Sequence, residues 1–349
     1  MQERIVRTYD QAIDILRIIA ILAVIMIHSS TRTIETTGND LLRIPWTLFL
    51  NQISRFAVPL FFMISGFVLE LSYSFNTNYF EYLKKRFSRI LIPYVFWSFI
   101  YFFFVYKNHS LGFLSSLFGG NASYQLYFIP SLLIFYIIFP FFHKLNKFFA
   151  NKWVLITLGL LQIFLLSLDY YFHSIHLVFP LAVSLLNFYV FILGMVASHN
   201  QGKVKEFVEK RRVLISAITL AFMFYVFFEG KILFYKTNNY LAFYSQWRPS
   251  VFLYTLFFGV GLYHAFNKLK LNQSIIKTLA GLSFFVFFVH VWVLEFLWKT
   301  AGLNLFQLTE GNIARQLWYD PAFFFLTGLF SFTIAFLIHK IPFVSKITG

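Results

Sequence analysis

The chain has 349 residues, of which 59% are hydrophobic, 22% aromatic and only 12% charged, so a water-soluble fold would have too little polar surface to cover its core. The absence of cysteine excludes a disulfide framework, a cysteine-ligated metal and a cysteine nucleophile. The net charge of +15 is carried by short Lys and Arg clusters between apolar runs, which is typical of membrane topology and not of nucleic-acid binding.

The apolar residues form ten windows of about the length that a helix needs to cross a membrane. These windows are 13–30, 51–72, 90–106, 124–143, 153–170, 177–197, 213–229, 248–266, 280–298 and 321–339. With both termini in the cytoplasm, nineteen of the 29 Lys and Arg residues lie in inner segments and eight in outer ones, as the positive-inside rule requires. We therefore predict an all-α, polytopic bundle of about ten transmembrane helices in the plasma membrane, built as one domain over residues 1–349.

The first window contains ionisable residues that a lipid-facing helix would avoid. Arg17 and His28 are eleven positions apart, about 20° beyond three helical turns, so they share one face and lie about 16 Å apart along the axis. Asp14 lies three residues before Arg17 and is its expected local partner. Such groups mark an interior site by default, although Arg17 could instead reach the headgroups and His28 could stabilise a helix contact.

A second basic group precedes the third window. Arg86 and Arg89 are three residues apart on one helical face, at the membrane level predicted for Arg17. Because guanidinium groups match the geometry of phosphate oxygens, the three arginines could form a seat for a di- or triphosphate on the cytoplasmic side. The same cluster could also act only as a topology signal.

The second and ninth windows contain further polar residues. Arg55 lies near the outer end of the second window, where binding of an acceptor and a position among the headgroups are both reasonable interpretations. Ser65 and Gly66 follow, and they favour close approach of another helix. In the ninth window, His290 either lines a tunnel or stabilises a helix contact, and Glu295 lies nearer the outer face.

These motifs, taken in order, resemble the acyltransferase-3 family of integral-membrane acyltransferases. The resemblance spans nearly the whole chain and is carried by Asp14, Arg17 with ten residues before His28, Ser65-Gly66-Phe67, Arg86-x-x-Arg89 leading into Ile92-Pro93-Tyr94, Phe128, Pro140 and the run from Ser283 to His290. The chain departs from the family at 125–128, where many members have a histidine and a tryptophan. It also lacks the extracytoplasmic hydrolase-like domain that is fused to some members.

The resemblance implies transfer of an acyl group, acetyl before succinyl, from cytoplasmic acyl-CoA to a hydroxyl of an extracytoplasmic carbohydrate such as a cell-surface polysaccharide. It implies that Arg17, Arg86 and Arg89 bind the phosphates of CoA while the pantetheine arm runs along the first helix. His28 would then remove the proton of the acceptor hydroxyl. The secondary candidates for substrate binding are Asp14, Arg55, His290 and Glu295.

Two other function classes share this composition. One is an exporter or flippase of a polysaccharide or lipid-linked glycan, and the other is an accessory partner of a polysaccharide synthase. Neither explains the Arg17 and His28 stripe together with the Arg86 and Arg89 pair, and a transporter should show paired broken helices from two related halves. The expected partners are acyl-CoA, the carbohydrate acceptor and membrane lipids, with a polysaccharide synthase as a further candidate. No metal is expected, because the sequence has no metal-ligand pair at helical spacing.

Overall fold

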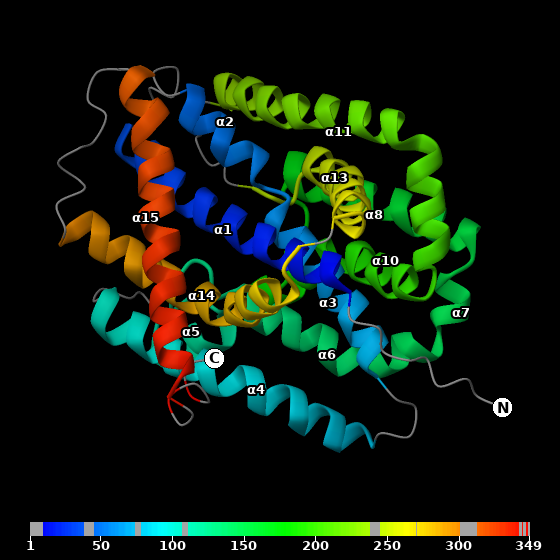
Figure 1. Cartoon of the computed structure of the whole chain (residues 1–349), viewed down its shortest axis with the longest axis horizontal. Helices are drawn as coiled ribbons and strands as arrows, with labels where there is room; N and C mark the ends of the chain where they lie inside the picture. Colours follow the sequence, from blue (N-terminus) through cyan, green and yellow to red (C-terminus); the bar gives the residue numbers. More distant parts are fainter. Residues whose placement is uncertain are drawn as a thin grey trace.

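The computed structural model describes residues 10–37, 45–73, 78–106, 111–237, 245–269, 271–300 and 313–341, together with residues 344 and 347. Throughout these residues the regular structure is helical and contains no strand (Figure 1). The helices are α1 (Gln11–Thr37), α2 (Pro45–Ile53), α3 (Ala57–Ser72), α4 (Tyr79–Ile100), η2 (Tyr101–Val105), α5 (Phe113–Gly119), α6 (Phe128–Lys144), α7 (Asn146–Phe149), α8 (Lys152–Phe172), α9 (Phe179–Leu186), α10 (Phe188–His199), α11 (Gln201–Thr237), α13 (Pro249–Asn267), α14 (Gln273–Lys299) and α15 (Ile313–His339).

All ten predicted windows correspond to helical segments. Among the described residues, eight helical segments are long and apolar enough to cross a membrane, and α9 with α10 forms a further candidate that bends by 48°. The remaining window, the fourth in chain order, contains α6, a shorter apolar helix of 17 residues. The predicted polytopic helical bundle is therefore confirmed, whereas the cytoplasmic position of both termini stays a prediction.

Several helices extend beyond the apolar windows. The helix of the third window begins at Tyr79, because the Asn78 side chain caps its first turn by accepting a hydrogen bond from the amide of Phe80. The second window contains two helices, α2 and α3, separated by a short turn at residues 54–56. Helix α11 bends at Arg211, so that its charged first part runs at an angle to the apolar part that follows (Figure 1).

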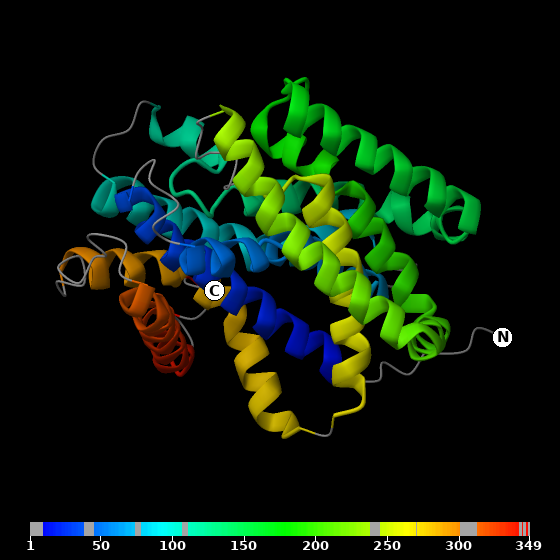
Figure 2. The same ribbon diagram turned by 90° about the horizontal axis from the view of Figure 1, so that it is seen from above.

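Helix α1 is the central element of the bundle. It packs against α2, α3, α13, α14 and α15, and α15 and α8 lie on opposite sides of the bundle in Figures 1 and 2. Ala20, Ile21 and Ile25 on α1 are fully buried. A helix that is buried between five others can keep polar groups away from lipid, and this position is what makes α1 able to carry an interior site.

The closest helix contact is between α3 and α10. An ideal Cβ built on Gly66 would lie 2.1 Å from the carbonyl oxygen of Phe191, and one built on Gly194 would lie 2.0 Å from the carbonyl oxygen of Met63. Two glycines on facing helices therefore let the two backbones touch, as small residues commonly do in membrane helices. The packing interpretation of Gly66 is confirmed.

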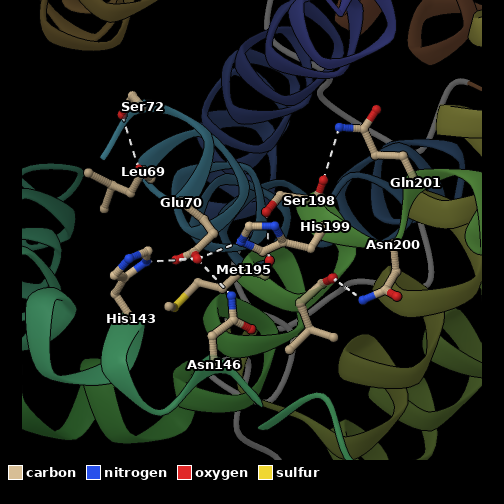
Figure 3. A network of polar contacts seen from close by, with 11 residues as sticks. Leu69, Glu70, Ser72, His143, Asn146, Met195, Ser198, His199, Asn200 and Gln201 are labelled. Atoms are coloured by element: carbon tan, nitrogen blue, oxygen red, sulfur yellow. Dashed lines mark hydrogen bonds and ion pairs between the residues drawn. The ribbon is translucent and has the colours of Figure 1, made fainter. Parts of the chain in front are cut away.

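A buried carboxylate joins the ends of α3, α6, α7 and α10 (Figure 3). Oε1 of Glu70 lies 2.8 Å from Nδ1 of His143, 2.6 Å from Nδ2 of Asn146 and 2.7 Å from Nε2 of His199. The side chain of Glu70 is fully buried. Because a buried carboxylate is stable only when it is hydrogen-bonded or paired, this cluster holds the four helix ends in one arrangement.

Candidate functional site

A cavity of about 540 Å³ surrounds the second half of α1. Its walls come from α1, from Arg55 and the start of α3, from the segment before α6 and the start of α6, from the start of α9, from the segment before α13, and from α14. Residues that line it on α1 are Val24, Ile27, His28, Thr31, Arg32 and Glu35. The volume lies within the range of ordinary small-molecule sites, and the lining combines aromatic rings with a few polar groups.

His28 lies in this cavity, half-buried, beside a second histidine. Its ring centroid lies 5.3 Å from that of His290 on α14 and 4.6 Å from that of Tyr124. His290 is fully buried, and its Nδ1 lies 3.0 Å from the carbonyl oxygen of Val286. A carbonyl oxygen can only accept, so Nδ1 of His290 carries a proton. Its Nε2 is buried without a hydrogen-bond partner and is available as an acceptor when the ring is neutral.

Two arginines place positive charge near the His28 ring. Arg32 and Arg55 both line the cavity and both interact electrostatically with His28. Arg55 is only 3% exposed, and its Nε donates to Oδ1 of Asn51 at 3.0 Å. A position of Arg55 among the lipid headgroups is therefore wrong, because its guanidinium is held inside the protein. Whether it binds an acceptor stays a prediction at this point.

Glu295 forms ion pairs within the protein, whereas its position in the sequence suggested contact with a substrate. It is 4% exposed and forms ion pairs with Arg32 and, at 2.8 Å, with Lys299. Arg32 also pairs with Glu35 at 3.1 Å. The cavity lining contains Arg32 and Glu35 but not Glu295. Glu295 therefore joins α14 to α1 beside the cavity, and its expected contact with a sugar stays untested.

The predicted arginine cluster gathers at the other end of α1. Arg17 pairs with Asp14 at 3.1 Å, as expected for this spacing, and Nη2 of Arg86 donates to Oγ of Ser72 at 2.6 Å. The hydroxyl of Tyr136 on α6 lies within electrostatic reach of Arg17, Arg86 and Arg89. Arg86 is half-buried and Arg89 is exposed, and a shared anion site for the three guanidiniums stays a prediction.

Helix α1 connects the two groups of residues. It runs without interruption from Gln11 to Thr37, so the about 16 Å expected between Arg17 and His28 along its axis holds. The residues that line the cavity on α1 begin at Val24. Arg17, Arg86 and Arg89 are therefore not part of the cavity lining.

Sequence reasoning missed the buried polar residues that surround the cavity. Arg248 was counted among the outer positive charges, yet it is fully buried, with Nη1 lying 3.5 Å from Glu229 and Nη2 donating to Gln52. Asn51, also fully buried, contacts Arg55 and α1. Their only signal in the sequence was the occurrence of charged and amide residues within or beside apolar windows.

The described residues form no recognisable metal-ion site. Within the part of the chain that the structure describes, no group of three or more His, Asp or Glu side chains is arranged to hold one. The side chains that line the cavity offer one imidazole, two guanidiniums, one carboxylate and a set of hydroxyl and amide groups. The second imidazole, that of His290, lies beside His28 but is not part of the lining. The lining set can remove a proton and stabilise a developing negative charge.

Comparison with known proteins identifies the family of this chain. A relative, the probable poly-β-1,6-N-acetyl-D-glucosamine export protein of Staphylococcus epidermidis, is 24% identical over 281 residues, which cover 74% of this chain and 73% of the relative. The protein of the same name from strain RP62A of that species matches equally. No solved structure matches the chain. The model of the acyltransferase-3 family, described as an acyltransferase domain, matches residues 10–340, so this protein belongs to that family and is an acyltransferase.

Proposed function

We propose that this protein transfers an acyl group, acetyl before succinyl, from cytoplasmic acyl-CoA to a hydroxyl of a carbohydrate at the outer face of the plasma membrane. The observation that carries the proposal is the arrangement on α1. One continuous helix holds Arg17 among three arginines near one end and His28 in a cavity near the other. An elongated donor with an anionic head and a thioester tip matches this arrangement.

The donor assignment is supported by the arginine cluster. CoA carries its negative charge on phosphate groups, and guanidiniums bind phosphate oxygens through charge-assisted hydrogen bonds. Arg86 is already oriented by its contacts with Ser72 and with the Tyr82 ring, whose centroid lies 5.9 Å away. Oδ1 of Asp14 accepts a hydrogen bond from Nη1 of Arg17. We therefore assign Asp14 the role of orienting Arg17 and not of binding substrate.

The acceptor assignment is supported by the wall of the cavity opposite α1. Tyr127, Phe179 and Trp247 pack edge to face with ring centroids 5.4 to 5.9 Å apart, and Gln246 donates to the Tyr127 hydroxyl at 2.5 Å. Aromatic faces beside amide and hydroxyl groups suit the apolar and polar sides of a sugar ring. The name of the S. epidermidis relative also refers to a glycan, poly-β-1,6-N-acetyl-D-glucosamine.

The reaction uses His28 as the general base. Its free ring nitrogen takes the proton of the acceptor hydroxyl while the hydroxyl oxygen attacks the thioester carbonyl carbon. The carbonyl oxygen becomes negatively charged, and the guanidinium of Arg55, which lines the same cavity as His28, stabilises this charge. The C–S bond then breaks, the CoA sulfur takes the proton from His28, and the products are the sugar ester and CoA.

A second candidate, glycan export, has one specific observation in its favour besides the printed name of the relative. Helices α9 and α10 form one bent span, broken at Asn187, and broken helices are typical of transporter sites. Transporters carry such breaks in pairs from two related halves, and the described residues contain one such helix pair. Export also leaves the arginine seat at the other end of α1 without a role.

The test is acyl transfer by purified protein with radiolabelled acetyl-CoA or succinyl-CoA and short β-1,6-linked N-acetylglucosamine oligomers. His28→Ala should keep the fold and the affinity for CoA but lower turnover by a factor on the order of 10² to 10⁴. His28→Gln, which preserves size and hydrogen bonding, should be as inactive. The matched control is His176→Ala, which changes an exposed histidine between α8 and α9.

Two results would contradict the proposal. Transfer by His28→Gln at a rate near that of the wild type would remove the histidine from catalysis. Absence of label in every oligomer, together with movement of glycan across vesicles that contain the protein, would favour export.

A further inference from the structure

We infer that Asn51 is a positioning residue for acyl transfer, because it holds the Arg55 guanidinium and the turn of α1 that carries His28 in one fixed arrangement. The inference rests on the proposed function, since it gives Asn51 a part in the same reaction. Asn51 lies on α2, is fully buried and is not among the residues that line the cavity. It therefore acts through its neighbours.

The amide oxygen of Asn51 fixes the arginine. Oδ1 accepts hydrogen bonds from Nε of Arg55 at 3.0 Å and from Nη2 of the same residue. It also accepts from Nε2 of Gln52 at 3.1 Å. Two contacts from one guanidinium to one oxygen set the direction of its plane as well as its position, as a single contact would not.

The amide nitrogen of Asn51 fixes α1. Nδ2 lies 3.1 Å from the carbonyl oxygen of Ile27, 3.0 Å from Oγ of Ser30 and 3.2 Å from Oγ1 of Thr31. Ile27 and Thr31 line the cavity on either side of His28 in the sequence. The carbonyl of Ile27 can only accept and a guanidinium can only donate, so the two ends of the Asn51 amide cannot be exchanged.

A buried ion pair, reached through Gln52, stabilises this arrangement. Gln52, the neighbour that donates to Asn51, accepts a hydrogen bond from Arg248, whose Nη1 lies 3.5 Å from Glu229. Glu229 in turn accepts from the Tyr171 hydroxyl at 2.7 Å. A fully buried arginine stays in place only while its partners satisfy it. The network therefore continues from α8 and α11 through the residue before α13 to the cavity, with Asn51 as its last member before α1 and Arg55.

This arrangement has a consequence for rate rather than for binding of the donor. A displacement of about 1 Å at a catalytic group can lower turnover about a hundredfold. In Asn51→Leu, an apolar side chain of similar size fills the space but offers Arg55 no acceptor. Ser30 and Thr31 keep hydrogen bonds to the α1 backbone, at 2.6 Å to Met26 and 2.7 Å to Ile27. The main effect of the substitution is therefore that Arg55 is no longer held in a fixed position relative to His28.

The experiment compares kcat, acyl-CoA affinity and melting temperature for Asn51→Leu and for a matched control, Gln162→Leu. Gln162 is also a buried amide that joins helices, since it donates to the carbonyl of Leu186 and accepts from the amide of Tyr189, each at 3.1 Å, but it does not line the cavity. We expect Asn51→Leu to lower kcat by roughly a hundredfold with unchanged acyl-CoA affinity. Gln162→Leu should lower only the melting temperature.

A double variant separates positioning from general damage. If Asn51 acts through Arg55, then Asn51→Leu added to Arg55→Ala should lower kcat by no more than about twofold beyond Arg55→Ala alone, because coupled residues are not additive. Losses that multiply, an active Asn51→Leu, or an equal loss in Gln162→Leu would each overturn the inference. Should Asn51→Leu fail to fold, Asn51→Asp replaces it. Aspartate keeps an acceptor for Arg55 but offers no donor to the carbonyl of Ile27 on α1, so a normal kcat in Asn51→Asp would overturn the inference.

The wild-type assay distinguishes this failure from failure of the proposed function. A wild-type protein that transfers no acyl group to any acceptor overturns both, since there is then no reaction to position. A wild-type protein that is active, together with any of the four contradicting results above, overturns the role of Asn51 alone.

Discussion

The contact between α3 and α10 gives a prediction whose size follows directly from the backbone geometry. In Gly66→Ala the new methyl group would lie 2.1 Å from the carbonyl oxygen of Phe191, and in Gly194→Ala it would lie 2.0 Å from that of Met63. Both obstructing atoms belong to the backbone, so no change of rotamer can remove the clash. The two helices must move apart by about 1 Å, and overpacking of this kind costs about 1–3 kcal/mol.

The matched control uses a glycine on a helix without such a contact. Gly281 on α14 has nothing within 4 Å of its ideal Cβ, and alanine is better than glycine in a helix by about 1 kcal/mol. Gly281→Ala should therefore keep or raise the melting temperature, whereas Gly66→Ala and Gly194→Ala should lower it. The seven tryptophans provide the fluorescence signal for thermal unfolding in detergent.

The glycine contact should also affect turnover. Helix α3 begins two residues after Arg55, so its displacement from α10 moves the cavity wall. We expect Gly66→Ala to lower acyl transfer more than it lowers CoA affinity. Equal melting temperatures for Gly66→Ala and Gly281→Ala would refute the reasoning, because the carbonyl contact would then not limit the approach of the helices.

Three further predictions concern the rest of the bundle. Arg86→Ala should weaken CoA binding by about 1.5–3 kcal/mol, and the loss should be smaller in high salt. The exposed Arg89 should contribute less than about 1 kcal/mol. If calorimetry finds the same CoA affinity for Arg86→Ala as for the wild type, the arginines act only as a topology signal. An impermeant thiol reagent added outside cells should label Ser174→Cys but not Lys85→Cys, and the reverse pattern would invert the orientation. Glu70→Ala should lower the free energy of unfolding by about 1–3 kcal/mol, and with it the melting temperature, because three side chains lose their shared acceptor. Glu70→Gln should lower it less. Equal stability of Glu70→Ala and the wild type would contradict this.

Much of the architecture could be predicted from the sequence because it depends on local properties. The hydrophobicity of a window determines whether it can cross a membrane, and each of the ten predicted windows contains helices. The geometry of a single helix also places Arg17 beside Asp14 and on the face of His28. The convergence of Arg17 with Arg86 and Arg89 stays a prediction, which requires that the helices that carry them begin at the same membrane level.

The positions where helices break could not be read from composition. The second window contains a turn at residues 54–56, and the sixth bends at Asn187 between α9 and α10. The break at Asn187 lies within apolar sequence. The turn at residues 54–56 is Ser-Arg-Phe, and Pro59 lacks the amide that would bond to the carbonyl of Arg55.

The partners of the buried polar residues were decided by the tertiary structure alone. Arg248 lies next to a loop in the sequence, but its partners Gln52 and Glu229 come from other helices. In the same way, Glu295 pairs with Arg32 on α1, and Asn51 bridges Arg55 and α1. Inside a membrane bundle a polar side chain must find a partner within the protein, and which partner it reaches depends on how helices far apart in the sequence pack together.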